Sequence, residues 1–153
     1  MSEYKGIKEL IMQQLLVIVN EKIEVASNAI QSATDARDNE SKSSAGDKYE
    51  TGREMMQIEI DKSTVQLNHA KHLKDELSRI IVSKMLKKAT FGSLIVTNQE
   101  TYFLSIGIGK LMVNEEHIYV ISIDSPLGKS FLNKRVGEHV VFQAKELIIQ
   151  EIR

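Results

Sequence analysis

The first 88 residues contain no proline and carry two stripes of apolar residues at helical spacing. Apolar residues that recur in steps of three, four and seven lie on one helix face, while the charged residues between them face water. The first stripe comprises Ile7, Ile11, Leu15, Ile18, Val25, Ala29 and Ala33; the second comprises Met56, Ile60, Leu67, Ala70, Leu73, Leu77 and Ile81. This half of the chain is therefore predicted to form two long helices.

A polar segment, residues 35–50, separates the two stripes. It is rich in Ser, Asn, Gly and Asp, which favour turns and helix caps. Ser43 or Ser44, followed by Asp47 and Glu50, is typical of a helix start. Two helices joined by such a turn are predicted to fold back antiparallel, each burying its stripe on the other.

An alternative is one continuous helix in an oligomeric coiled coil. Gly46 and the neighbouring serines disfavour it, because glycine inside a helix costs about 1 kcal/mol relative to alanine. A hairpin arm of about 30 residues would be roughly 45 Å long at a rise of 1.5 Å per residue. That length favours a rod that carries its tip away from a body.

From residue 90 onward the pattern changes to short runs rich in β-branched and aromatic residues, which predict strands. The Asp124-Ser125-Pro126 segment can begin a short helix, since Asp or Ser caps a helix and proline fits its first turn. The fold class is therefore α+β, a helical hairpin followed by a small antiparallel sheet with one short helix. The predicted strands fall in residues 91–96, 101–105, 117–123, 138–143 and 147–152.

Charge and cysteine content restrict the classes of function. The formal net charge of −1 argues against a protein that binds nucleic acid by bulk charge, because such domains are usually strongly basic. The absence of cysteine excludes disulfides and thiolate metal sites. No signal peptide or membrane span is indicated, so we expect a cytoplasmic, monomeric protein.

Several motifs then resemble one family, the GreA/GreB transcript cleavage factors, along nearly the whole chain. The most specific is the order strand, Ser-x-Asp-Ser-Pro, helix, Val-Gly-Glu, strand within residues 121–141. The other matching motifs are Phe91-Gly92-Ser93, Arg135-Val136-Gly137-Glu138 and the spacing of Tyr49 to Arg53-Glu54. The resemblance implies a helical hairpin over residues 1–87, with its tip at about 36–48, and an FKBP-like domain over residues 88–153.

The same resemblance implies a partner, bacterial RNA polymerase. The FKBP-like domain of the family binds the rim helices of the β′ subunit, and Asp124, Ser125 and Pro126 match the docking segment. A carboxylate beside a rigid proline turn is a preorganised contact for a partner helix. The alternative is that Asp124 merely caps the short helix, and both roles are compatible.

In the family the hairpin enters the secondary channel and brings paired acidic side chains to the polymerase's magnesium. This chain departs from that pattern, because residues 42–45 are Lys-Ser-Ser-Ala where the acids are expected. Nearby acids are Asp38, Glu40, Asp47 and Glu50; Asp47 is the best candidate to face magnesium, and Glu40 is next. The alternative is that Asp47 and Glu50 only favour the positive N-terminal end of the second helix. Transcript cleavage and non-cleaving regulation therefore both stay open.

The protein is expected to have no stable metal site, no cofactor and no catalytic activity of its own, and at most to share the polymerase's magnesium. His69-x-x-His72 lies on a charged helix face and is interpreted as solvated rather than as a metal pair. Gly107-Ile-Gly109-Lys110 lacks the further features of a phosphate loop and is interpreted as a strand turn.

Two further classes compete with a polymerase regulator. The first is an FKBP-like prolyl isomerase, but the isomerase pocket needs aromatic residues, and several of the few present are needed for the core. The second is a coiled-coil chaperone, which would need an exposed apolar tip, whereas this tip is polar. The Asp-Ser-Pro match favours the polymerase regulator.

Overall fold

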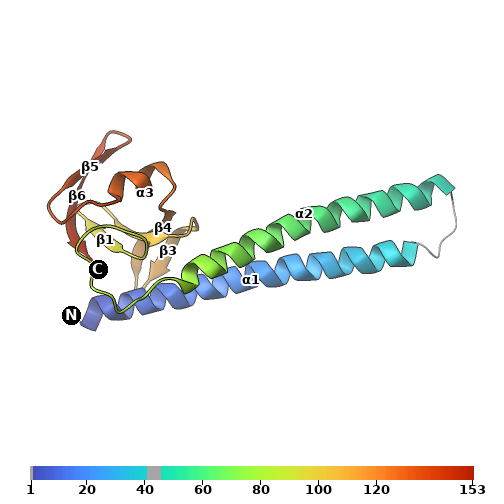
Figure 1. Cartoon of the computed structure of the whole chain (residues 1–153), viewed down its shortest axis with the longest axis horizontal. Helices are drawn as coiled ribbons and strands as arrows, with labels where there is room; N and C mark the ends of the chain where they lie inside the picture. The colour runs from blue at the N-terminus through green and yellow to red at the C-terminus, as the bar shows by residue number, and fades with distance from the viewer. Residues whose placement is uncertain (1, 41–45) are drawn as a thin grey trace. The chain divides into compact units, whose positions relative to one another are not determined.

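The computed structural model describes residues 2–40 and 46–153. The described chain begins with two long helices, α1 (Ser2–Glu40) and α2 (Gly46–Ser78). A sheet domain with one short helix follows (Figure 1). The chain divides into two compact units, residues 15–75 and residues 1–14 with 76–153, and each is described by itself.

Residues 15–75 form an antiparallel helical hairpin, as the sequence predicts. Near one end Arg37 Nη1 donates to Gln57 Oε1 at 2.8 Å. Further along, Lys22 of α1 and Ala70 of α2 line the same shallow groove. Arg37, late in α1, therefore lies beside Gln57, early in α2, whereas Lys22, earlier in α1, lies near Ala70, later in α2. The two helices run antiparallel, and Figure 1 shows them side by side.

The seam of the hairpin follows most of the predicted stripes, whose members are buried or partly buried with two exceptions. Val25 is 68% exposed, and Ile81, beyond the end of α2, is 63% exposed. The buried positions follow steps of three, four and seven, the spacing that keeps one seam facing a partner helix. The buried seam residues of this unit are Leu15, Val19, Ala26, Ala33, Ser63, Ala70 and Leu73.

The polar connection between the helices is shorter than predicted. α1 continues to Glu40, and Gly46 begins α2 rather than lying in a turn. Side-chain contacts support the last turns of α1, including the bond from Gln31 Nε2 to Asp35 Oδ1 at 3.0 Å. The predicted cap at residues 43 and 44 lies outside the described residues.

The described part of the sheet domain has six strands in the spatial order β3-β4-β2-β1-β6-β5. Four of its strand pairs are antiparallel, but β2 and β4 run parallel. Alternating hydrophobicity predicts which face of a strand is buried but not the direction of its neighbour, so this pair could not be read from the sequence. The strands are β1 (Leu94–Thr97), β2 (Thr101–Ser105), β3 (Gly109–Val113), β4 (Glu116–Ser122), β5 (His139–Phe142) and β6 (Lys145–Ile152).

The strand β3 was not predicted from the sequence, which indicated only a turn at residues 107–110. Gly109 has φ +107°, a left-handed backbone that favours glycine, and it begins the strand instead of ending a loop. β3 then returns to β4 through Asn114 and Glu115, both with positive φ, as a two-residue hairpin turn requires. β3 lies at one edge of the sheet, and β4 lies between β3 and β2.

The core of the domain lies between the sheet and the short helix α3 (Pro126–Phe131). Phe131 of α3 is fully buried among strand residues, including Tyr102, Leu104, Leu147 and Ile149. On the edge strand β3, the backbone carbonyl of Met112 accepts a hydrogen bond from Gln14 Nε2 of α1 at 3.2 Å. Among residues 2–40 and 46–153, no helix is long and apolar enough to cross a membrane.

Candidate docking surface and hairpin tip

The predicted docking segment begins where β4 ends, at Ser122. The carbonyl of Ser122 accepts two hydrogen bonds from Ser125, one from its backbone N–H at 3.1 Å and one from its hydroxyl at 2.6 Å. The Ser122 hydroxyl oxygen accepts the backbone N–H of Asp124 at 3.1 Å. These bonds satisfy polar groups that a tight turn would otherwise leave unpaired, so the backbone of residues 122–125 is held firmly.

Ser125 is the N-cap of α3. Its backbone is extended, with φ −68° and ψ 156°, and its hydroxyl oxygen accepts the N–H of Gly128 at 3.0 Å. Pro126 occupies the first helical position, where its missing N–H leaves no bond unmade. The sequence left the cap open between Asp124 and Ser125, and the structure assigns it to Ser125.

Gly128 allows α3 to lie directly on the end of β4. A Cβ atom at this position would meet the backbone oxygen of Ser122 at 2.0 Å, far inside van der Waals contact. Because backbone cannot move aside as a flexible side chain can, residue 128 has to be glycine in this arrangement. Local sequence patterns do not reveal the need for glycine here, because the restriction comes from the packing of α3 on the end of β4.

Asp124 is exposed and is not the cap of the helix. No hydrogen bond or ion pair to its carboxylate is found among the described residues. Pro126 is exposed beside it, whereas Ser125 is partly buried through its capping role. The segment therefore presents a carboxylate on a fixed backbone, with the serine as support. The docking role of these three residues stays a prediction.

Aromatic side chains hold the buried face of α3 against the core. The rings of Tyr102 and Phe131 are 5.1 Å apart, and the Tyr102 hydroxyl donates to Glu100 Oε2 at 2.9 Å. Burial, and then the bond to Glu100, raises the pKa of Tyr102 well above its ordinary value. These rings belong to the core, as does the fully buried Phe103, which leaves them unavailable to line a prolyl isomerase pocket.

At the hairpin tip, two of the four predicted acids have described side chains. Asp38 is 63% exposed and accepts a bond from Arg37 Nε at 3.4 Å, while the same guanidinium binds Gln57 on α2. Glu50 is exposed on the first turns of α2. Glu40 ends α1 and Asp47 is the second residue of α2, but their side chains lie outside the described set. The pairing of the four acids stays a prediction.

The remaining candidates do not form sites in the described chain. His69 and His72 are exposed on α2. Within residues 2–40 and 46–153, no group of three or more His, Asp or Glu side chains is placed to hold a metal ion. Lys110 lies with its Nζ 5.9 Å from the centre of the Tyr119 ring, so the Gly107–Lys110 segment supplies a cation–π contact on a strand.

Two solved structures are similar to this chain along nearly its whole length. One is the crystal structure of GreA factor homolog 1 (Gfh1) of Thermus thermophilus, with 21% identity, 95% of this chain and 94% of that chain covered, and a TM-score of 0.36. The other is described as the transcription factor Gfh1, with 19% identity, 92% of each chain covered and a TM-score of 0.35. Both similarities are to a GreA-like factor, the kind of protein that the sequence resembles. No protein-family model and no curated protein sequence matches the chain.

Proposed function

We propose that this protein is a Gre-type transcription elongation factor that binds bacterial RNA polymerase. The sheet domain docks on the β′ rim helices through Asp124 and Pro126, and the hairpin enters the secondary channel to modulate elongation. The protein acts as a cytoplasmic monomer without a cofactor. It performs no chemistry of its own and at most stimulates the polymerase's own RNA cleavage.

The observation that carries this proposal is the exposed carboxylate of Asp124 on a rigid turn. The Ser122 carbonyl, the Ser125 cap and Gly128 hold the backbone of this turn, and no ion pair to the carboxylate is found in the described part of the chain. An exposed carboxylate of this kind is available to a basic or amide-bearing partner. Preorganisation limits the entropy lost on binding, which favours affinity.

The first experiment measures the affinity of RNA polymerase core for the protein. Asp124→Ala should weaken binding by about tenfold, for the loss of a charge-assisted contact of about 1.4 kcal/mol. Pro126→Ala should weaken it less, because it removes the rigidity of the turn and no charge. Glu116→Ala is a matched control, because Glu116 is an exposed carboxylate of the same domain away from the turn. Unchanged affinity of the Asp124 variant would overturn the docking assignment, and no binding by the wild type would overturn the proposed function.

The second experiment distinguishes cleavage from non-cleaving regulation. A backtracked elongation complex with magnesium is incubated with the wild type, and RNA cleavage is measured. Carboxylate oxygens hold divalent cations, so Asp47→Asn should reduce cleavage strongly if Asp47 faces the magnesium. Glu40→Gln should have a smaller effect, and Asp75→Asn, on the same helix far from its start, serves as the control. A wild type that binds without stimulating cleavage would be a channel regulator.

A further inference from the structure

The two edges of the sheet are not equally protected. On the β3 edge, the carbonyl of Met112 already accepts a hydrogen bond from Gln14 of α1. The other edge is β5, which pairs with β6 alone. An unpaired edge presents a row of backbone N–H and C=O groups to whatever lies beside it.

The register of the β5–β6 hairpin shows which groups face outward. Gln143 and Ala144 have φ of 47° and 65°, which identifies a two-residue turn closed by Phe142 and Lys145. Bonded pairs alternate along an antiparallel ladder, so Phe142 and Val140 bond to β6. The N–H and C=O groups of His139 and Val141 therefore point away from β6, toward the open edge.

This open edge borders a groove. A shallow cavity of about 260 Å³ is lined by Ser130 of α3, by Lys134 just beyond it, and by His139, Val140 and Val141 of β5. Ser130 donates its hydroxyl to the carbonyl of Pro126 at 3.0 Å, which fixes the helical wall. The groove thus has a strand edge on one side and a helix with a cationic end on the other.

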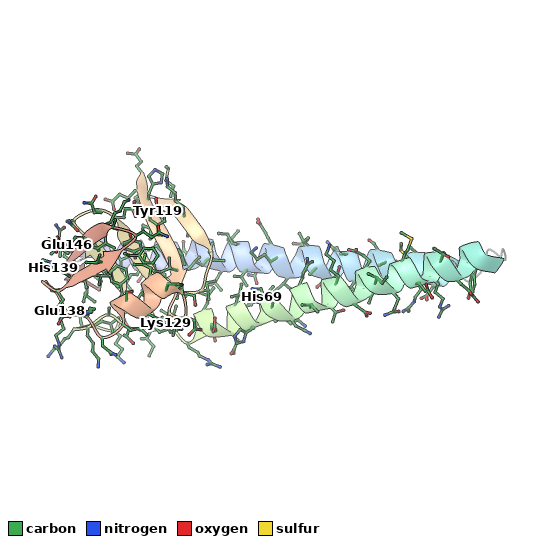
Figure 2. The ribbon with its side chains drawn as sticks, turned by 90° about the horizontal axis from the view of Figure 1, so that it is seen from above. His69, Tyr119, Lys129, Glu138, His139 and Glu146 are labelled. Atoms are coloured by element: carbon green, nitrogen blue, oxygen red, sulfur yellow. The ribbon has the colours of Figure 1, made fainter. Side chains whose placement is uncertain are left out.

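The lining of the groove is partly apolar and contains one lysine, Lys134. Val141 is 70% exposed, and Lys134 approaches Glu138 only at 3.9 Å. Glu146 of β6 binds His139 Nδ1 at 2.6 Å, and Figure 2 labels both residues together with Lys129 on α3. Outside this lining, residues 129–146 carry three further cations, Lys129, Arg135 and Lys145, and two carboxylates, Glu138 and Glu146. Lys145 lies 4.0 Å from Glu100.

We propose that the β5 edge and α3 form a receptor groove for an extended acidic segment of a partner protein, which joins the sheet as an added strand. Main-chain bonds to His139 and Val141 supply the affinity, and Lys134 in the groove selects acidic side chains. A second copy of this chain is disfavoured, because a symmetric β5–β5 contact would oppose the same cations. The groove is separate from Asp124, so the inference does not rest on the proposed polymerase docking.

The test is a titration of the isotopically labelled full chain, followed through its backbone amide signals. The probe is a capped decapeptide in which Glu alternates with Thr and Val, used at up to millimolar concentration. Saturable shifts centred on His139, Val141 and Lys134 are expected. A matched peptide with Lys in place of Glu should bind at least fivefold more weakly, since like charges would then face the groove.

Two variants test the geometry. Val141→Pro removes one outward N–H without breaking a ladder bond, as proline is tolerated on an edge strand, and should weaken binding about fivefold. Val141→Thr keeps the N–H and serves as the control. If the proline variant fails to fold, a probe peptide N-methylated at alternate residues should show the same loss with the wild-type protein.

Three results would overturn the inference. The first is the absence of saturable binding, and the second is equal affinity for the Glu and Lys peptides. The third is a dimer of the free chain in light scattering that Val141→Pro abolishes, because the edge would then be occupied by a second copy.

Discussion

The hairpin and the sheet domain bury different kinds of side chain. The seam of the hairpin contains three alanines and a serine, Ala26, Ala33, Ala70 and Ser63. The sheet domain instead buries large side chains, among them Phe103, Phe131, Ile95, Leu104 and Leu147. Buried apolar area contributes about 25 cal/mol per Å², so the alanine and serine positions of the hairpin seam contribute less than the large side chains buried in the sheet domain.

Exposed large apolar side chains occur in both regions. Val25, Met55, Ile58 and Val65 of the hairpin are each more than half exposed. Met85, Met112, Val136 and Val141 of the unit that contains the sheet are also more than half exposed. The buried side chains therefore distinguish the two regions, and on that basis we expect the sheet domain to be the more stable one.

The largest expected effect is a loss of stability of the sheet domain. Phe131→Ala should destabilise the sheet domain by about 3–5 kcal/mol, through lost burial and the cavity left under α3. Urea denaturation, with hydrogen exchange read separately in the two regions, measures the change. Val65→Ala, on the exposed face of the hairpin, should alter stability by less than about 0.5 kcal/mol. Equal losses for both variants would contradict the comparison.

A smaller loss is expected at the seat of α3. Gly128→Ala should destabilise the domain by about 2–3 kcal/mol, because the new Cβ meets the Ser122 oxygen and the helix must shift. Gly107→Ala is the matched control, since its Cβ would lie 3.8 Å from the Ser122 side chain at ordinary contact. Thermal melting of both variants would show the difference, and a neutral Gly128 variant would mean that α3 is not held against β4.

The third prediction concerns Lys8, a residue that the sequence did not identify as buried. It is 2% exposed, its Nζ has no hydrogen-bond partner among the described residues, and burial lowers its pKa from 10.5. A buried unpaired cation is unfavourable. Lys8→Met should therefore stabilise the protein by about 1–2 kcal/mol at pH 7, whereas Lys22→Met, at an exposed position of the same helix, should be nearly neutral.

The pH dependence of the Lys8 effect has a definite sign. Between the lowered folded pKa and 10.5, the unfolded chain binds more protons than the folded chain, so wild-type stability rises with pH in that window. The advantage of the Met variant should shrink as pH approaches 10.5, in urea denaturation at a series of pH values. A constant advantage would mean that Lys8 is charged and solvated in the folded protein.

The smallest expected effect concerns a buried serine in the seam of the hairpin. Ser63 is buried in the seam and donates to Glu59 Oε1 at 3.3 Å within its own helix. Ser63→Ala should stabilise the hairpin by about 0.5 kcal/mol, because alanine has the higher helix propensity. Slower hydrogen exchange in the middle of α2 would show it. A loss of stability would instead indicate that the hydroxyl is needed at the seam.

The sequence predicts most of the architecture and most of the buried face of the hairpin. Helical periodicity and the absence of proline were sufficient for the hairpin, although Val25 proves exposed. Val25 lies one residue before Ala26, which takes the seam position in the heptad repeat of Val19, Ala26 and Ala33. The parallel pairing of β2 with β4 was out of reach for another reason, since strand direction is set by topology.

The sequence also predicts some features of the candidate site and not others. The Ser-Pro pair predicts the start of α3 because capping and proline preference are local effects. The need for glycine at residue 128 depends on how closely α3 packs on the end of β4, and the groove beside β5 depends on the pairing of β5 with β6. Local sequence patterns therefore predict the helix start at the proposed docking segment, whereas its surroundings require the folded domain.

The small residues of the hairpin seam also determine how thick the hairpin is. Alanine and serine at a helix contact allow the two axes to approach to the lower end of the usual range, about 8 Å. With helix diameters of about 10 Å, a pair of this kind has a cross-section of roughly 20 by 10 Å. Any opening that admits the hairpin must exceed those dimensions, and replacing Ala33 or Ala70 by a bulky residue would widen the hairpin beyond a closely fitting passage.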